Sequence, residues 1–367
     1  MKLALVDPYS PETERIWRDL EVASPPSYFL SWGWVESWLA TLPRDQAPPL
    51  AVIDAGGAPI AACFLARQLV LRNRVMPSRA LYLNVTGTQR FDELWIEYNG
   101  LVGANLTLSE LLALLPWGWD ELYLPALHAG AFGNIEQASD IRVRIDRQVP
   151  SYFVDLERAR PKGYLAMLSS QTRSQVRRAQ REAGKYVVEI ARDPSEAIDI
   201  YSELVALHGA QWRAKGKSGA FADPWFDRFH RRLITQRFAH GEIQLLRVRG
   251  DQTGTIGCLY NHIYRGRVLQ YQSGVAAFDN AHLKPGFVCH AAAIEHALAN
   301  GLAVYDFLGG DMRYKKQLST DQTTLTWARV QRKRLRFLLE DRLREWRHKR
   351  AAAVTPPADP VAPPAAA

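Results

Sequence analysis

The sequence predicts a mixed α/β fold, of the α+β class, made of two related copies. Each copy is expected to contain a mixed and mostly antiparallel sheet flanked by helices. Residues 242–308 read as three strands in hairpin order, a helix and a strand that returns to the sheet. Residues 50–124 repeat that order more loosely, which indicates internal duplication. The chain of 367 residues is also long for one hydrophobic core and sufficient for two.

The second copy has the clearer pattern. Turn residues at Gly250–Gly254 and at Arg265-Gly266 separate strand-like segments, and Gly301 suits the end of an alanine-rich helix. The predicted strands are 242–248, 255–264, 267–275, 303–308 and 323–330, and the predicted helix is 285–300.

The first copy is expected to follow the same plan. Leu-Ala-Val-Ile-Asp before the turn at Gly56-Gly57 mirrors Leu-Leu-Arg-Val-Arg before Gly250. Its predicted strands are 50–54, 59–70, 80–85 and 121–124, and its predicted helix is 109–115. Further helices are expected at 29–42, 172–181 and 195–215.

We therefore expect a degenerate first domain over 1–148 and a second domain with the working site over 149–331, joined by an extended segment around Pro150. Residues 332–350 are predicted to form a basic amphipathic helix, because Leu335, Leu338, Leu339, Leu343 and Trp346 fall on one face. This helix either packs on the protein or lies on an anionic membrane surface, and both alternatives stay open. The Ala/Pro-rich residues 351–367 are expected to be a disordered tail.

The positive charge is concentrated in two segments. The net charge is +8, of which 173–185 contributes +4 (five bases, one acid) and 332–350 contributes +6 (nine bases, three acids), so the remainder sums to −2. This distribution favours local contact with an anionic group over general coating of nucleic acid.

The chain is expected to be cytoplasmic, with contact to the inner membrane if 332–350 binds lipid. No apolar run approaches about 20 residues, and the N-terminal apolar run stops at Asp7-Pro8, too early for a signal peptide. Cys63, Cys258 and Cys289 are isolated, which argues against a disulfide framework and a zinc site, so no metal is expected.

The start of the helix at Pro285 is a candidate anion site. Proline suits the first helical position, and Gly286 lets a bulky group approach the backbone. The unpaired N–H groups at the positive end of a helix bind phosphate or diphosphate, and Lys284 adds a cation there.

The segment Tyr305-Asp306-Phe307-Leu308-Gly309-Gly310-Asp311, followed by Tyr314-Lys315, resembles the C-terminal signature of the FemAB-related, CelD-like acetyltransferases of the GNAT superfamily. Pro285-Gly286 before an alanine-rich helix and the arginine-rich helix 172–181 are also similar to that family. The resemblance covers about 150–330, and less of the first half. Lys284 stands where the family usually has serine, and Leu318 where tryptophan is common, which leaves the donor and the acceptor open.

The resemblance implies tandem GNAT-like domains and transfer of an acyl group, expected to be acetyl, from acyl-CoA to an amine. The donor's diphosphate would lie at Gly286, and its reactive end would reach Asp306. Asp306 would orient or deprotonate the amine, or cap the following turn; Tyr314 would protonate the leaving thiolate, or pack in the core. The donor site is expected to include Val275, Lys284, Pro285, Gly286 and Phe287.

Other residues are expected to bind substrate. Lys315 follows a flexible Gly309-Gly310 turn and would hold a phosphate. Three arginines at helical spacing would hold a phosphorylated acceptor, or form a solvated basic face: Arg173, Arg177 and Arg178. The acceptor side is expected to include His208, Trp212, Tyr271, His290 and Asp311.

Three functions follow as alternatives. The first is a CoA-dependent N-acyltransferase whose acceptor is a small molecule or a glycan or peptide precursor of the cell envelope. The second is a FemAB-like aminoacyl transferase that uses charged tRNA in peptidoglycan synthesis, although the long helical hairpin typical of such enzymes is missing. The third is a non-catalytic module of polysaccharide assembly, docked through 332–350.

Overall fold

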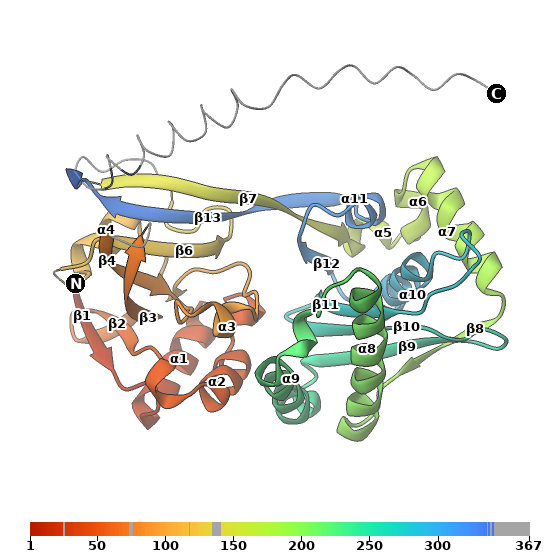
Figure 1. Cartoon of the computed structure of the whole chain (residues 1–367), viewed down its shortest axis with the longest axis horizontal. Coiled ribbons are helices and arrows are strands. Elements are labelled where there is room, and N and C mark those ends of the chain that lie inside the picture. The colour runs from red at the N-terminus through yellow and green to blue at the C-terminus, as the bar shows by residue number, and fades with distance from the viewer. Residues whose placement is uncertain are drawn as a thin grey trace, which may run out of the picture.

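A computed structural model describes residues 1–24, 26–72, 76–116, 118–133, 141–335, 337 and 340. The described part of the chain forms two lobes side by side, connected by two long strands (Figure 1). Most of the predicted basic helix 332–350 and all of the predicted tail 351–367 lie outside the described residues.

A sheet of thirteen described strands runs through both lobes in the order β1-β2-β3-β4-β6-β13-β7-β12-β11-β10-β9-β8, with β5 pairing β3. Among these strands, two neighbouring pairs are parallel, β4 with β6 and β11 with β12. The strands are β1 (Lys2–Val6), β2 (Leu50–Ala55), β3 (Ala58–Arg72), β4 (Met76–Leu83), β5 (Val102–Gly103), β6 (Glu121–Leu127), β7 (Ile141–Asp155), β8 (Tyr186–Ile190), β9 (Ile243–Gly250), β10 (Gly254–Tyr264), β11 (Arg267–Val275), β12 (Val304–Gly309) and β13 (Asp321–Arg332).

The order of the strands is symmetrical about the pairing of β13 with β7. The run β1-β2-β3-β4-β6-β13 matches the run β8-β9-β10-β11-β12-β7, and in each run the parallel pair is joined through a helix. That helix is α4 (Leu108–Leu114) in the first lobe and α10 (Pro285–Ala299) in the second. The predicted fold, two related copies of a mixed and mostly antiparallel sheet with flanking helices, is confirmed.

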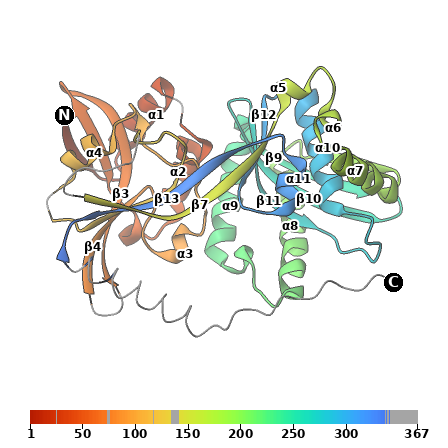
Figure 2. The same cartoon turned by 90° about the horizontal axis from the view of Figure 1, so that it is seen from above.

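Strands β7 and β13 connect the lobes. They pair antiparallel along their length, from Asp321 opposite Phe153 to Arg332 opposite Ile141. In addition, β7 pairs β12 of the second lobe, whereas β13, near the end of the described chain, pairs β6 of the first lobe. Figure 2 shows the two strands running together from one lobe to the other. Strand β7 thus crosses the predicted domain boundary at 148/149, which itself stays a prediction.

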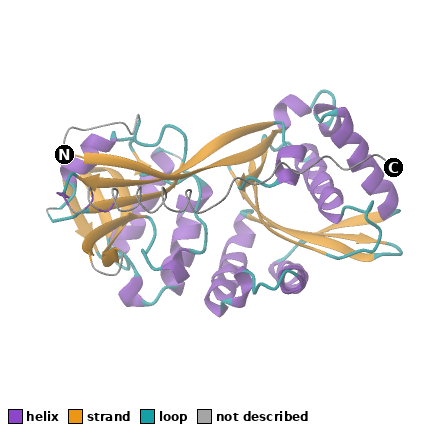
Figure 3. Cartoon of the chain, turned by 45° about the horizontal axis from the view of Figure 1, so that its top comes forward, coloured by secondary structure: helices purple, strands orange, loops and turns teal. Residues whose placement is uncertain are grey.

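Helices cover both faces of the second lobe's sheet (Figure 3). One face packs against α8 and α9, and the opposite face against α7 and α10. The remaining helices are α1 (Pro11–Ala23), α2 (Trp32–Thr41), α3 (Gln89–Asp92), α5 (Leu156–Ala159), α6 (Tyr164–Met167), α7 (Ser170–Ala183), α8 (Pro194–Ala214), α9 (Pro224–Arg237) and α11 (Arg313–Leu318), with 3₁₀ turns η1 (Tyr28–Leu30), η2 (Arg44–Gln46), η3 (Ala220–Ala222) and η4 (Phe238–His240).

Side-chain caps fix where the helices near the site begin. Asp193 accepts a hydrogen bond from the backbone of Glu196 at the start of α8, as the sequence Asp-Pro-Ser predicts. Ser169 does the same for Thr172 at the start of α7. Helix α10 has no side-chain cap at Lys284.

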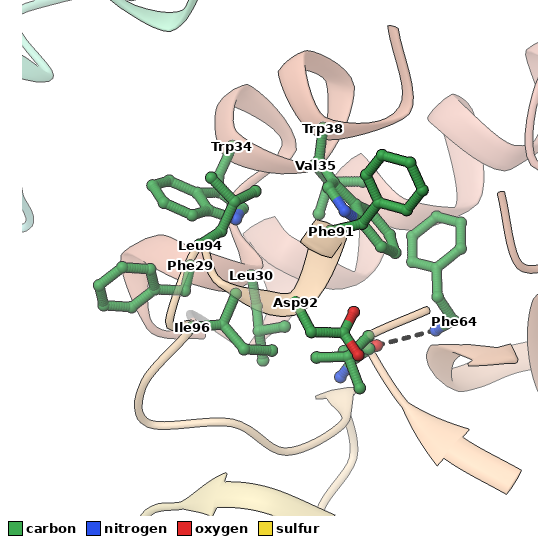
Figure 4. A pocket seen from close by; sticks show the side chains of 12 residues that line it. Phe29, Leu30, Trp34, Val35, Trp38, Phe64, Phe91, Asp92, Leu94 and Ile96 are labelled. Carbon is green, nitrogen blue, oxygen red and sulfur yellow. Dashed lines mark hydrogen bonds between the residues drawn. The ribbon is translucent and has the colours of Figure 1, made fainter. Parts of the chain in front are cut away.

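Aromatic side chains join the two lobes into one core. Trp34 of α2 lies with its ring centroid 4.9 Å from that of Phe229 of α9, and Phe91 lies 5.0 Å from Trp225. Figure 4 shows the apolar space between α2 and the segment that carries Phe91 and Leu94. Its volume is about 20 Å³, which is room for about one water. We therefore treat this space as core packing rather than as a ligand site.

Two histidines are buried in this interlobe core. His230 of α9 and His262 of β10 have no exposed surface, and none of their ring nitrogens has a hydrogen-bond partner in the described structure. Burial lowers the pKa of His262 to about 3 and lowers the pKa of His230 well below its ordinary value. Both side chains are therefore neutral in the folded protein at neutral pH. His262 stacks on Tyr28, and His230 lies against the tilted ring of Tyr271.

The fold should consequently lose stability in mild acid. An unfolded histidine titrates near 6.5, so between that pH and about 3 the unfolded state binds the proton and the folded state does not. At pH 5, His262 alone should lower the free energy of unfolding by about 2 kcal/mol relative to pH 8. Urea unfolding at the two pH values measures this, and His262→Phe should reduce the loss whereas the exposed His240→Gln should not. An identical pH dependence in His262→Phe would contradict the prediction.

Candidate active site

The parallel pairing of β11 with β12 stops after three residues. Arg267, Val268 and Leu269 face Val304, Tyr305 and Asp306, and beyond them no further pair joins the two described strands. Strand β11 continues to Val275 along β10, while β12 bends away at an irregularity between Asp306 and Gly309. The separation opens the sheet between the two strands and in front of α10.

A cleft of about 1080 Å³ lies at this opening, between the lobes. This is slightly larger than the roughly 300–1,000 Å³ typical of sites that bind small molecules and cofactors. Its walls come from β11, the ends of α8 and β12, the starts of α10 and α11, and the first lobe. The lining residues include Trp95, Glu97, His208, Trp212, Lys217, Tyr271, Val275, Gly286, His290, Gly309, Tyr314 and Lys315.

The N-terminus of α10 faces the cleft at Gly286. Pro285 has no N–H, and the amides of Phe287 and Val288 both donate to the carbonyl of Lys284. The Gly286 amide has no partner among the described residues, and a Cβ built there would meet no heavy atom within 4 Å. The site thus offers one free amide at the positive end of a helix, with open space in front of it.

Of the predicted donor-site residues, Val275 and Gly286 line the cleft, whereas Lys284, Pro285 and Phe287 do not. Lys284 donates to Gln175 at 2.9 Å, and its ammonium lies 5.1 Å from the ring centre of Phe287. The side chain of Phe287 is buried in the core under α10. Lys284 therefore fixes the start of α10 against α7 instead of facing the cleft.

Asp306 is placed differently from the expectation. Its carboxylate has no exposed surface and is not part of the cleft wall. Successive strand residues point to opposite faces, so Tyr305 and Phe307 pack toward α10 and Asp306 points away from it. There it accepts hydrogen bonds from Tyr98 at 2.6 Å, from Arg267 at 2.8 Å and from the backbone N–H of Leu308 at 2.8 Å. A donor bound at Gly286 thus does not reach Asp306 through the cleft.

Another carboxylate occupies the cleft wall. Glu97, from the first lobe, accepts a hydrogen bond of 2.7 Å from the backbone N–H of Gly309 and is 9% exposed. Burial raises the pKa of Glu97 above its ordinary value, against the lowering effects of the Gly309 amide and the Lys315 charge. A carboxylate whose pKa approaches neutrality is suited to accept a proton.

Lys315 holds the turn after β12. Its ammonium donates to the carbonyl of Leu308 at 3.1 Å and to that of Gly309 at 2.8 Å. Leu308 has φ of 61°, a left-handed conformation that is strained for a branched residue and needs such support. Burial lowers the pKa of Lys315, and the charges of Glu97 and Asp306 raise it in part. The third N–H of the ammonium has no partner among the described residues and is available to a ligand in the cleft.

Tyr314 and His290 form the wall below this turn. Their rings stack with centroids 5.4 Å apart and an interplanar angle of 13°. Burial raises the pKa of Tyr314 to about 12, so the hydroxyl keeps its proton at neutral pH. Burial lowers the pKa of His290 to about 3, and its Nδ1 lies 3.3 Å from the hydroxyl of Tyr305.

The opposite wall contains His208, Trp212 and Tyr271, and their role on the acceptor side stays a prediction. The Trp212 indole donates to Nε2 of His208 at 2.7 Å, which requires a neutral histidine, and burial lowers the pKa of His208 to about 4. Lys215 and Lys217 lie over the Trp212 ring. Tyr271 donates to the carbonyl of Leu94 at 2.7 Å and thereby joins β11 to the first lobe.

The three predicted arginines of α7 lie outside the cleft. Arg173 and Arg177 line a separate hollow of about 410 Å³ with Glu295 and Leu298, near the C-terminal end of α10. Arg178 is exposed and lies 4.0 Å from Glu182. Asp311 is also outside the cleft wall and accepts a hydrogen bond from Tyr152 at 3.2 Å. Nothing in this arrangement brings these four residues to Gly286, so their role in binding substrate stays a prediction.

Sequence reasoning missed the contribution of the first lobe, above all Glu97 and Trp95. The available signal is an acid inside the apolar run Leu-Trp-Ile-Glu-Tyr at 94–98. Among the described residues, no group of three or more His, Cys, Asp and Glu is arranged to hold a metal ion. No described helix is both long enough and apolar enough to cross a membrane.

Comparison with known proteins gives a match to one family model over part of the chain and several solved structures with a similar fold. Residues 170–316 match the family model described as Acetyltransferase (GNAT) domain. Solved structures that resemble the chain include FemX, with a TM-score of 0.56, 12% identity, and coverage of 89% of this chain and 97% of that chain. The chain matches no curated protein.

Two further solved structures share the fold. They are L-PGS from Bacillus licheniformis (TM-score 0.52, 10% identity, 90% of this chain and 94% of that chain) and the C-terminal domain of a putative lysylphosphatidylglycerol synthetase from Agrobacterium fabrum (0.50, 12%, 88% and 92%). At sequence identities of 10–12%, the structural similarity shows that the two-lobed fold is shared.

Lys315→Met should destabilise the protein, because two buried carbonyl oxygens lose a charged donor. We expect the free energy of unfolding to fall by about 2 kcal/mol. The exposed neighbour Lys316→Met is the control and should change it by less than about 0.5 kcal/mol. Urea unfolding followed by tryptophan fluorescence measures both, and equal stabilities of the two variants would show that Lys315 does not hold the turn.

Proposed function

We propose that the chain is an N-acyltransferase of the GNAT superfamily that moves an acyl group from acyl-CoA to an amine. The match of residues 170–316 to the model described as Acetyltransferase (GNAT) domain supports this proposal, as does the signature at 305–315. The observation that carries this proposal is the cleft between β11 and β12, which ends at the unpaired amide of Gly286. A diphosphate-bearing donor fits there, because the helix end favours negative charge and Gly286 leaves space for it. Acetyl-CoA is the donor that we propose.

The chemistry needs a base and an acid on the two sides of the reacting carbonyl. In our proposal, Glu97 accepts the proton of the attacking amine as its nitrogen bonds to the thioester carbon. The carbon–sulfur bond then breaks, and Tyr314 donates its proton to the leaving thiolate. The raised pKa of each group supports its role, because Glu97 can bind a proton near neutral pH and Tyr314 retains one.

Asp306 and Lys315 act in this proposal as positioning residues. Asp306 accepts the N–H of Leu308, and Lys315 binds the carbonyls of Leu308 and Gly309. Together they hold the strained turn, whose Gly309 amide in turn orients Glu97. His290, which stacks on Tyr314, would fix the direction of that hydroxyl.

For the acceptor, we propose an amine of a cell-envelope sugar or peptide precursor, bound against Trp212 and Tyr271. The aromatic wall and the nearby Lys215 and Lys217 suit an acceptor with a flat ring face and negative charge. The alternative donor is the aminoacyl ester of a charged tRNA. Because the chain shares its fold with FemX, this alternative donor stays in consideration. Acyl transfer from charged tRNA in the absence of acyl-CoA would favour it.

Gly286→Leu should abolish donor binding without harming the fold. Acetyl-CoA should raise the melting temperature of the wild-type protein, because the stabilisation grows with the logarithm of one plus its concentration over Kd. A leucine at 286 has space in the folded protein but occupies the proposed diphosphate position, so affinity should fall at least about tenfold. Ala299→Leu, exposed at the other end of α10, is the control. The donor site is refuted if no acyl-CoA raises the melting temperature of the wild-type protein, or if acetyl-CoA raises that of Gly286→Leu by the same amount.

Glu97→Gln should slow transfer while acetyl-CoA still binds. Glutamine keeps an oxygen for the Gly309 amide but cannot accept the proton, so kcat should fall by about 10²–10⁴-fold. Thiol release from acetyl-CoA with a panel of amines measures the rate, and the thermal shift measures binding. Glu93→Gln tests the other carboxylate of the wall. If kcat fell strongly in Glu93→Gln and stayed unchanged in Glu97→Gln, the base would be assigned to the wrong residue.

A further inference from the structure

A second cavity lies between the lobes, at the other end of β11 from the cleft. Its volume is about 560 Å³, within the range typical of small-molecule sites. Its walls are the segment after α1, the segment around β5, the loop after β6 and the β10–β11 turn. The side chains that line it include Tyr28, Phe132, His128, Tyr264, Arg265 and Arg267. None of the groups assigned above to acyl transfer lines this cavity.

The segment Leu94–Tyr98 separates this cavity from the cleft. Glu97 faces the cleft and Gly309, whereas the adjacent Tyr98 lines the second cavity and donates to Asp306. Trp95 and Tyr98 both have positive φ, 52° and 53°, so the segment turns sharply as it crosses between the lobes. The two hollows are therefore distinct sites that share a thin wall.

The second cavity combines positive charge with an apolar floor. Among the described residues of its lining are Arg265, Arg267 and His128, and these residues include no aspartate or glutamate. Asp306, buried behind the wall, pairs with Arg267 through one nitrogen, and the side chain of Arg267 remains 41% exposed. Arg265 is exposed and forms no ion pair with a described carboxylate; it donates to the backbone oxygen of Glu21 at 3.4 Å, and its guanidinium lies 5.4 Å from the ring centre of Tyr264.

Glu21, whose backbone oxygen accepts the bond from Arg265, forms no ion pair with Arg265 or Arg267 among the described residues. The carboxylate of Glu21 accepts hydrogen bonds from the Tyr264 hydroxyl and from the backbone of Trp32, both at 2.8 Å. Its two oxygens are thus occupied within the wall. Arg265 and the free N–H groups of Arg267 are left as donors for an anion, and guanidinium groups bind planar carboxylates and phosphates well.

We propose that this cavity binds an organic anion: a carboxylate or phosphate group held by Arg265 and Arg267, with an apolar or aromatic body against Tyr28 and Phe132. The proposal does not depend on acyl transfer, because it uses other residues and another opening. Carboxylate and phosphate share the recognition chemistry, and the experiment distinguishes them.

Isothermal titration calorimetry of the full chain with 2-naphthoate, 2-naphthyl phosphate and the neutral 2-naphthamide tests the site. At least one of the two acids should bind at one site per chain, and the tighter acid identifies the preferred group. The amide should bind at least about tenfold more weakly, because it cannot pair with a guanidinium. If neither acid binds, or if the amide binds as tightly as the acids, the proposal is wrong.

Variants locate the bound probe. Arg265→Gln should weaken binding of the acid by about tenfold, and Asn105→Trp, at an exposed lining position, should block the cavity. Both changes are at exposed positions, so the fold should survive, as the melting temperature will show. Lys217→Gln in the cleft and saturating acetyl-CoA should leave probe binding unchanged. Loss of binding with Lys217→Gln or displacement by acetyl-CoA, with Arg265→Gln unaffected, would place the probe in the cleft and overturn the proposal.

Discussion

The parallel pairing of β11 with β12 stops at Leu269 and Asp306, and the rest of the site depends on this early stop. Because β12 bends away, the backbone of β11 and the first turn of α10 face an open space instead of a neighbouring strand. The bend is held by Asp306 on one side and by Lys315 on the other. Buried and hydrogen-bonded polar groups here serve to keep a gap in a sheet that would otherwise close.

Each lobe supplies what the other lacks. The second lobe contributes the gap, the helix end and the strained turn, while the first contributes Glu97, Trp95 and the carbonyl that anchors Tyr271. The interlobe core of tryptophans and buried neutral histidines fixes the lobes relative to each other. A change that loosens this core would move Glu97 relative to Gly309 without touching any group in the cleft.

Local pattern predicted the segments that carry strong periodicity, and it predicted Gly286, because a helix start is encoded by adjacent residues. It did not predict α9, and it gave only an extended segment at Pro150 where the structure has all of β7. The motif around Asp306 predicted that its carboxylate acts on the acceptor amine. Side chains alternate between the two faces of the sheet along β12, however, and Asp306 points away from α10. Glu97 lies more than two hundred residues from Gly309 along the chain, and only the docking of the lobes brings them together.

Strand β7 pairs with the second lobe and β13 with the first, and this crossed pairing has a consequence for biosynthesis. Strand β6 ends at residue 127, but its outer partner β13 begins at residue 321. The ribosome therefore releases the first lobe with an unpaired strand edge, which stays open while nearly two hundred further residues are made. The nascent lobe must be shielded during that interval, and β13, the last of the described strands, completes both lobes at once.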